Sequence, residues 1–228
     1  MAARAHHAAG PERESSHAVE NYVKAVYALA QRDGVVTTNA LAERLGVTPA
    51  SASGMVKRLH ERGLVRHVRY RGVALTARGE RLALEVLRHH RLLELFLAEA
   101  LGMPWDRVHQ EAERLEHAIS PELAELIAAK LGDPTHDPHG DPIPTRDGRV
   151  ADAPTQTLQA LEAGERGTFV RVSDAEPAML RYLAERGIAP GDAFEVVDKQ
   201  PFDGPVFARF GAEVHALGGA LARAMRVR

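Results

Sequence analysis

Two short helical segments joined by a tight turn constrain the fold of this chain more strongly than any other feature. Residues 40–45 follow an apolar helical pattern, and Gly46 is placed to end that helix. Thr48 and Pro49 then supply the hydroxyl cap and first-turn proline of a second helix, which the apolar spacing predicts over 49–62. A short helix, a three-residue turn and a second helix are typical of a helix-turn-helix.

A further helix is predicted before this motif. Residues 18–31 place apolar side chains at helical spacing, and Gly34 follows the end of the pattern. Either Thr38 or Asn39 is expected to cap the next helix. Residues 1–17 contain no apolar run, so we expect a disordered arm there and not a secretory signal.

The segment after the second helix predicts a β-hairpin with a basic tip. Residues 64–68 and 73–76 resemble strands and are joined by R-Y-R-G. Between Lys57 and Arg81 there are eight basic and two acidic residues, although the whole chain has a formal net charge of −2. A solvated basic surface is one reading of this block, and a polyanionic partner is the other. Next to a helix-turn-helix, the basic hairpin predicts a winged DNA-binding domain for double-stranded DNA.

The second helix of the motif is expected to enter the major groove. Its small side chains allow close approach but read bases weakly, so part of the specificity is expected to come from DNA shape. Ordinary surface filling is the alternative for the serines. The side chains expected to meet base edges or phosphates are Thr48, Ala50, Ser51 and Ser53, and those expected to meet phosphates are Lys57, Arg58, Arg69 and Arg71.

Imidazoles and carboxylates are concentrated between His89 and His117. Four of them share one helical face, at offsets of 0, 4, 7 and 8, and a further pair lies one turn apart earlier in the chain. Such groups converging between helices can hold a divalent transition metal, or they can belong to a solvated face that merely supports the helix. The first set is His109, Glu113, Glu116 and His117, and the pair is His90 and Glu94.

The helix predicted from Thr76 to Leu101 is apolar on more than one stripe. Such a helix is expected to be buried by its own domain and by a second subunit, which predicts a homodimer with two-fold symmetry. A helix over 105–119 and another from Ser120 to Gly132 are expected to complete a helical domain.

A Pro-, Gly- and Asp-rich segment follows, over 132–155, and is expected to be a linker or a structured loop. His136 and His139 within it are expected not to bind metal. Beyond it, strands are predicted over 167–172, 194–197, 206–210 and 224–227, with a helix over 176–186. Short strands with one helix indicate a small β-barrel of the SH3 type.

The predicted architecture is mainly α and contains three domains. These are a winged helix-turn-helix domain at 1–78, a helical dimerisation and metal-binding domain at 79–150, and a small SH3-like β-barrel at 151–228. The absence of cysteine excludes disulfides, thiolate catalysis and cysteine-type zinc sites, and it is compatible with the cytoplasm. The apolar runs are too short and polar to span a bilayer, so we expect no membrane association.

These segments resemble the diphtheria toxin repressor family of metal-dependent transcriptional regulators, including its manganese transport regulator branch. The resemblance covers about residues 18–145 and is looser in the tail, which resembles the family's SH3-like (FeoA-like) third domain. It implies a regulator that divalent metal activates for operator binding, and the family's usual output is repression of metal uptake genes. The matching segments are E-N-Y-V-K-A-V-Y-A-L, L-A-E-R-L-G-V-T-P-A-S-A-S, R-H-H-R-L-L-E, V-H-Q-E-A-E-R-L-E-H-A-I-S and D-P-H-G-D-P-I-P.

The resemblance also implies two metal sites. The primary site would take one ligand from the first helix and three from the central helix, with His90 nearby and recruited in the manganese branch. The ancillary site would add a ligand from the third domain, for which Glu176 is the candidate. By position the primary ligands are Asn21, Glu113, Glu116 and His117, and the ancillary ligands are His90, Glu94, His109 and Glu176.

Departures from the family pattern change the expected metal and operator. Glu113 stands where the iron-type repressor has Cys, which favours Mn²⁺, although Fe²⁺ also accepts such donors. Asn21 offers only a neutral amide oxygen, so the adjacent Glu20 could take its place. Lys24 argues against the close binuclear pair of the manganese branch. Gly54 replaces a base-reading Gln, so the iron-type operator does not carry over.

Two rival functions remain open from the sequence. A metallohydrolase could use His and Glu clusters to activate water, but the chain has neither a His-Glu-x-x-His pattern nor a Gly-rich phosphate loop. A winged-helix regulator with vestigial metal sites could instead respond to another effector through its third domain.

Overall fold

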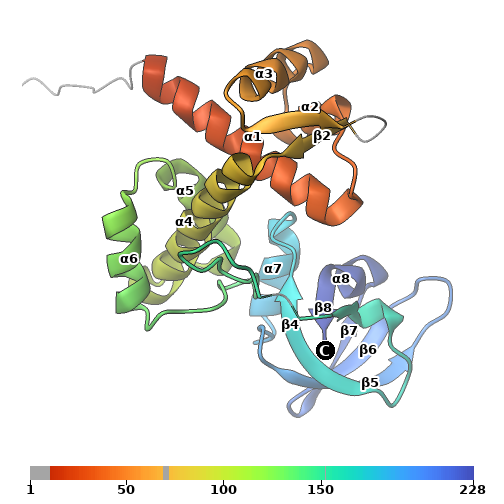
Figure 1. Cartoon of the computed structure of the whole chain (residues 1–228). Helices are drawn as coiled ribbons and strands as arrows, with labels where there is room; N and C mark the ends of the chain where they lie inside the picture. Colours follow the sequence, from red (N-terminus) through yellow and green to blue (C-terminus); the bar gives the residue numbers. More distant parts are fainter. Residues whose placement is uncertain (1–10, 69–71, 152) are drawn as a thin grey trace, which may run out of the picture. The chain divides into compact units, whose positions relative to one another are not determined.

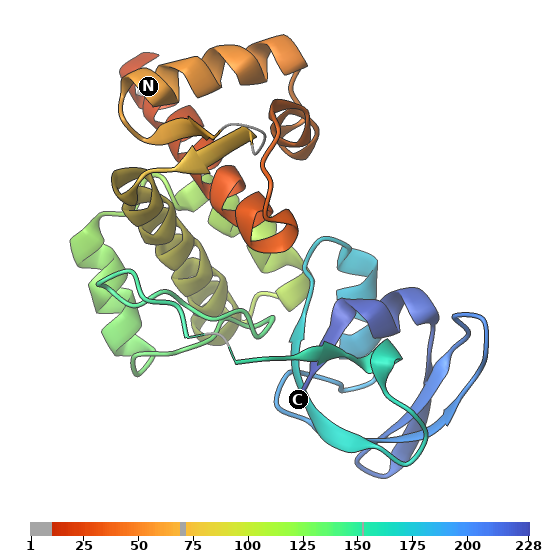
Figure 2. The same ribbon diagram turned by 45° about the vertical axis from the view of Figure 1, so that its right-hand side comes forward.

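The computed structural model describes residues 11–68, 72–151 and 153–228, which divide into two compact units (Figures 1 and 2). The division falls inside one long helix, after Arg88. No helix within the described ranges is both long and apolar enough to cross a membrane. The predicted fold class is confirmed: the chain has a helix-rich first half and middle, and a sheet in its last third.

The first unit is the winged helix-turn-helix, built around one apolar core. The core side chains of α1, α2 and α3 recur at helical spacing, so each helix turns one face inward. Val36 joins this core and pairs with the second strand through an isolated bridge. The elements are α1 (Pro11–Asp33), α2 (Thr38–Leu45), α3 (Pro49–Glu61), β1 (Val65–Val68), β2 (Gly72–Leu75) and the first half of α4 (Ala77–Leu101).

Helix boundaries in this unit follow the capping chemistry with two corrections. Thr48 caps α3 as predicted, whereas Thr37 caps α2 by accepting the N–H of Ala40, so neither Thr38 nor Asn39 is the cap. The helix expected from residue 18 begins at Pro11, because proline suits a first turn and helix-forming residues follow it. The arm expected over 1–17 is therefore helical from residue 11, and residues 1–10 lie outside the described ranges.

The predicted hairpin is present as β1 and β2, which pair antiparallel from Val65↔Leu75 to Val68↔Gly72. Gly72 has φ 70°, and a Cβ there would lie 2.1 Å from the carbonyl oxygen of Val36. Only glycine fits this close approach of two backbones. Arg69 and Arg71, the predicted phosphate contacts of the wing, lie outside the described residues.

The second unit begins with the rest of α4 and continues through two more helices. Here α5 (Trp105–Leu115) is shorter than predicted, so Glu116 and His117 fall in the turn that follows it. Helix α6 (Pro121–Lys130) starts after the Ser120 cap. The loop after α6 then passes across the C-terminal half of α4 in both ribbon views (Figures 1 and 2).

The last part of the unit is a six-stranded sheet with the order β3-β8-β4-β5-β6-β7 and its own apolar core. Strand β4 pairs with both β8 and β5, and the β4–β8 and β5–β6 ladders each contain a register shift, so the sheet curves. The sequence missed β7 and α8. The elements are β3 (Gln156–Thr157), the 3₁₀ turn η1 (Leu158–Ala160), β4 (Arg166–Val172), α7 (Pro177–Ala184), β5 (Ala193–Lys199), β6 (Val206–Phe210), β7 (Glu213–Leu217), α8 (Gly219–Ala224) and β8 (Met225–Val227).

Candidate metal centre and DNA-binding surface

The outward face of α3 carries the residues predicted to meet DNA. Ala52, Val56 and Leu59 point into the core, and the helical period therefore exposes the positions between them. The hydroxyls of Thr48 and Ser51 lie 2.9 Å apart, and the N–H of Ser51 donates to Thr48 Oγ1. Ser51 is thus engaged in the helix cap. The exposed residues of the predicted set are Thr48, Ala50, Ser51, Ser53, Lys57 and Arg58.

Glu94 is the centre of the buried polar cluster in the second unit. Its side chain projects from α4 and is almost completely buried. Its Oε1 lies 3.0 Å from His90 Nε2 on the same helix and 3.1 Å from His109 Nδ1 on α5. His109 Nδ1 also lies 2.8 Å from Oδ2 of Asp174, in the connection between β4 and α7. His90, Glu94, His109 and Asp174 therefore form a set of N and O donors close enough to share one cation.

A second group of donors shares His90. Its Nδ1 lies 2.5 Å from Glu116 Oε2, so the imidazole stands between the Glu116 and Glu94 carboxylates. His90, Glu113 and Glu116 bring their ligand atoms within 4.8 Å of one another. His117 Nε2 lies 3.4 Å from Glu116 Oε1 but falls outside this compact set. The structure thus brings His90, Glu113 and Glu116 together, and their role as metal ligands stays a prediction.

The loop after α6 contributes to a third group of possible metal donors, which the sequence did not predict. His139 is completely buried, and its Nε2 lies 2.9 Å from the carbonyl oxygen of Trp105. Because a carbonyl only accepts, Nε2 carries a hydrogen in this contact. Among the described residues Nδ1 has no hydrogen-bond partner, and it lies 3.9 Å from Glu94 Oε2. A buried ring nitrogen beside a carboxylate can share a cation with it, and Asp137 completes the group.

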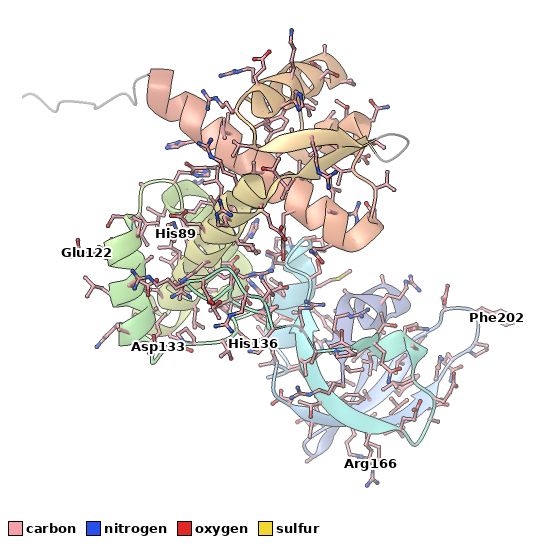
Figure 3. The ribbon with its side chains drawn as sticks, viewed as in Figure 1. His89, Glu122, Asp133, His136, Arg166 and Phe202 are labelled. Atoms are coloured by element: carbon pink, nitrogen blue, oxygen red, sulfur yellow. The ribbon has the colours of Figure 1, made fainter. Side chains whose placement is uncertain are left out.

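The two histidines of this loop therefore differ. Figure 3 shows His136 at the surface, where its ring bonds the neighbouring Thr135 hydroxyl. The sequence predicted that neither histidine binds metal. The structure places His136 away from the donor groups but places His139 in one of them. The signal in the sequence was the D-P-H-G-D segment, whose glycine allows a close backbone approach. A Cβ on Gly140 (φ 86°) would lie 1.9 Å from the Val170 carbonyl oxygen.

The electrostatics of the cluster reflect its excess of carboxylates. Burial alone would raise the pKa of Glu94, but its hydrogen bonds with His109 and His90 outweigh burial and lower it. The hydrogen bond with Asp174, followed by the one with Glu94, raises the pKa of His109 to about 10. Burial and then the charge of Asp141 hold the pKa of Asp137 well above its usual value. In the metal-free cluster, protons and protonated imidazoles therefore offset the negative charge of the carboxylates. A bound divalent cation would offset the same charge.

Two ligands were predicted outside the central helices, one in the third domain and one in the first helix, and their outcomes differ. Glu176, the candidate third-domain ligand, instead caps α7, where its carboxylate accepts the N–H of Ala178. Asp174, two residues earlier, occupies the cluster in its place. Asn21 and Glu20 lie on α1 in the first unit and are half-buried, and their role as a metal ligand stays a prediction.

Comparison with known families assigns all three parts of the chain. Residues 15–73 match the N-terminal DNA binding domain of iron dependent repressors. Residues 76–145 match the metal binding and dimerisation domain of the same repressors. Residues 156–228 match the FeoA domain.

Individual relatives extend these matches over nearly the whole chain. The iron-dependent repressor IdeR of Mycobacterium leprae (strain TN) is 32% identical over 222 residues, which cover 91% of this chain and 95% of that protein. The diphtheria toxin repressor of Corynebacterium jeikeium (strain K411) is 32% identical over 170 residues, covering 72% and 70%. A solved manganese-dependent transcriptional repressor in complex with manganese has a TM-score of 0.84 and 43% identity, covering 92% and 98%. ScaR with bound Cd²⁺ has a TM-score of 0.77 and 27% identity, also covering 92% and 98%.

Proposed function

The chain belongs to the family of iron-dependent repressors and is a metal-dependent DNA-binding transcriptional regulator, and from this premise we propose that Mn²⁺ switches it on as a repressor of metal uptake genes. Fe²⁺ is the alternative ion. In this proposal the protein acts in the cytoplasm as a homodimer on double-stranded operator DNA and catalyses no reaction. Its domains lie near the boundaries 1–78, 79–150 and 151–228.

The donor set supports a hard or borderline divalent ion. Every group in the three described clusters offers a carboxylate oxygen or an imidazole nitrogen, and the chain contains no cysteine. Carboxylate-rich sites suit Mn²⁺, and imidazole is compatible with both Mn²⁺ and Fe²⁺. Among the solved relatives, one structure is a manganese complex, and ScaR has been solved with Cd²⁺ or Zn²⁺.

We assign two ion positions. The first would use Glu113, Glu116 and His90, with His117 and either Asn21 or Glu20 completing it. The second would use Glu94, His109, Asp174 and His139, with Asp137 beside them. Bound there, the ion supplies a positive charge that several carboxylates share.

The chain's own residues determine what such an ion would connect. His90 contacts carboxylates of both positions, so one imidazole lies beside each of them. Asp174 comes from the third domain and His109 from α5, so the second position joins these parts of the unit. Metal and DNA then strengthen each other's binding reciprocally, because linkage is symmetric.

Exposed leucines on the helical domain support the homodimer. Leu126 is 62% exposed and Leu123 is 48% exposed on α6, and Leu115 at the end of α5 is 41% exposed. Figure 3 shows Glu122 projecting outward from the same helix. Apolar side chains exposed in series on one helix are typical of a surface that another subunit covers. A two-fold dimer would present two α3 helices to successive major grooves, about 34–36 Å apart or a multiple of that.

The observation that carries the proposal is the buried His139 Nδ1, which has no hydrogen-bond partner among the described residues and lies 3.9 Å from the buried Glu94 carboxylate. A vestigial site would be expected to satisfy that nitrogen with a protein donor. The test is DNA selection from a random-sequence pool with purified protein and Mn²⁺, followed by measurement of affinity for the selected fragment with Mn²⁺, Fe²⁺ or chelator. Tight binding only with metal supports the proposal, and equal binding with chelator favours the regulator with vestigial metal sites.

A further inference from the structure

Arg91 follows the cluster residue His90 on α4 but belongs to neither group of metal donors. Its side chain is 16% exposed, and it extends to the loop after α6. There the guanidinium contacts three different residues. Nη1 donates to the Pro142 carbonyl, Nη2 lies 3.3 Å from Asp141 Oδ1, and Nε lies 3.7 Å from Asp137 Oδ2.

The loop that Arg91 contacts is a rigid turn. Asp137 Oδ1 accepts the backbone N–H groups of His139 and Asp141, each at 2.9 Å. The His139 carbonyl accepts the N–H of Val172 on β4, and Gly140 allows the close approach described above. The Asp141 carboxylate also lies 3.5 Å from Arg171 Nη1 on β4. The turn is therefore bound to β4 on one side and to α4 on the other, and on the α4 side Arg91 makes polar contacts with Pro142, Asp141 and Asp137.

We propose that Arg91 is a positioning residue for the second ion position, holding the turn of Asp137 and Asp141 against α4 so that His139 Nδ1 stays directed at Glu94. This inference rests on the proposed function, because it assigns a role at the same metal centre. Arg91 touches no metal in this account. It acts through the turn that carries His139.

Charge and shape both select an arginine for this task. Glu94, Asp137 and Asp141 bring three carboxylates together in a largely buried region, and each disfavours the others' charge. The Arg91 guanidinium between the two aspartates offsets that repulsion, and Glu94 can then pair with the histidines. The guanidinium fork reaches acceptors on three residues at once, which the single ammonium of lysine cannot match.

A purely structural role is the competing explanation, in which Arg91 only stabilises the fold. The two explanations differ in what they predict for the two ion positions. Loss of general stability would weaken both positions together. Loss of positioning would weaken the position that contains His139 and spare the one that contains Glu113.

The experiment is calorimetric titration of the full-length metal-free protein with Mn²⁺ alone. The two binding events are first assigned with Glu113→Gln and His139→Gln, each of which should weaken one of them. Arg91→Met should then weaken the His139 event by about 10–100-fold, the usual effect of removing a residue that orients a ligand, and leave the Glu113 event unchanged. Arg91→Lys should recover part of the loss. Arg149→Met, at an exposed pair in the same linker, is the matched control.

A second readout comes from the only tryptophan. The Trp105 ring is stacked on His139, with centroids 5.9 Å apart, so Mn²⁺ binding beside His139 should quench Trp105 fluorescence. In Arg91→Met the quenching should shift to the same higher Mn²⁺ concentration as the calorimetric event. If this variant fails to fold, Asp141→Asn removes the charge of one of the three residues that Arg91 contacts, and it should shift the same event in the same direction by a smaller factor.

The titrations test metal binding and the role of Arg91 separately. If the wild type binds no Mn²⁺, the proposed function fails. If the wild type binds at both positions and Arg91→Met retains both affinities, or loses both equally, the positioning role is overturned. A selective loss of the His139 event supports it.

Discussion

The DNA-binding unit and the metal centre differ in where their charged side chains lie. On α3 the charged side chains of Lys57 and Arg58 are exposed above an aliphatic core that would be stable without them. Around Glu94 the charged groups are buried or half-buried and contact one another. A substitution on α3 should therefore change DNA binding without changing the stability of the fold. A substitution around Glu94 should change both, unless a bound cation offsets the change in charge.

The largest effect on DNA binding is expected from the subunit surface. Leu126→Glu places a charge on the most exposed leucine of α6, and burying it in a dimer would be costly. Sedimentation equilibrium should show monomers, and affinity for the selected operator should fall by more than about 100-fold because only one half-site is then bound. Val197→Glu, at an exposed apolar position in β5, should change neither quantity. A dimeric Leu126→Glu variant would place the interface elsewhere.

A smaller and sequence-independent effect is expected from Lys57→Ala. Removing one phosphate contact should weaken binding to every DNA sequence and reduce the slope of log affinity against log salt by about 1. Filter binding at several salt concentrations measures both, and metal response should persist. The control is Lys199→Ala, which removes a lysine from the third domain. An unchanged salt slope would exclude Lys57 from the DNA contact.

A further test uses the loop glycine. Gly140→Ala introduces a methyl group at a positive φ and against the Val170 carbonyl, so the turn that carries His139 should be displaced from β4. We expect a loss of the His139 ion position and a lower Tm, of roughly the size that about 1–3 kcal/mol of strain produces. Gly164→Ala is the matched control, since it shares a positive φ of 89° but meets no atom within 4 Å. Mn²⁺ binding equal to that of the control would contradict the role of the turn.

The effect expected to be smallest on DNA binding is a pH dependence of the stability of the metal-free protein. The pKa of His109 is about 10 instead of 6.5, so its contribution to stability is full below pH 6.5 and lost as pH rises through about 10. Thermal melts in chelator should show Tm falling across that interval, and Asp174→Asn should flatten the fall because it removes the principal partner of His109. Parallel profiles for the two proteins would contradict this assignment.

Local patterns predicted most of the fold. The caps and stops of α3, the hairpin and the long α4 follow from residues within one turn of each boundary. The pairs His90–Glu94 and His109–Glu113 follow from helical spacing. Where the prediction failed, at the cap of α2, three adjacent residues (Thr37, Thr38 and Asn39) can all act as caps, and the local pattern does not distinguish them.

The metal centre was predicted only in part, because its remaining groups come together through long-range packing. Asp174 reaches His109 where the third domain contacts α5, and there the Trp105 indole donates to the Leu180 carbonyl and Asp106 pairs with Arg181. Glu176 has the same charge nearby but is used as a helix cap. No spacing rule connects residue 139 to residue 94, so the sequence could not distinguish His139 from the exposed His136.

The central claim is that metal at the α4–α5 cluster controls DNA binding, and Glu116→Gln tests it most directly. Glu116 is buried and contacts His90, and the substitution removes its charge while preserving its shape. Affinity for the selected operator should be measured at fixed salt with Mn²⁺ and with chelator, for both proteins. Mn²⁺ should raise the wild-type affinity by about 5–150-fold, the usual range of such coupling, and should leave the variant near its metal-free affinity. Equal metal responses in the two proteins, or none in the wild type, would contradict the account.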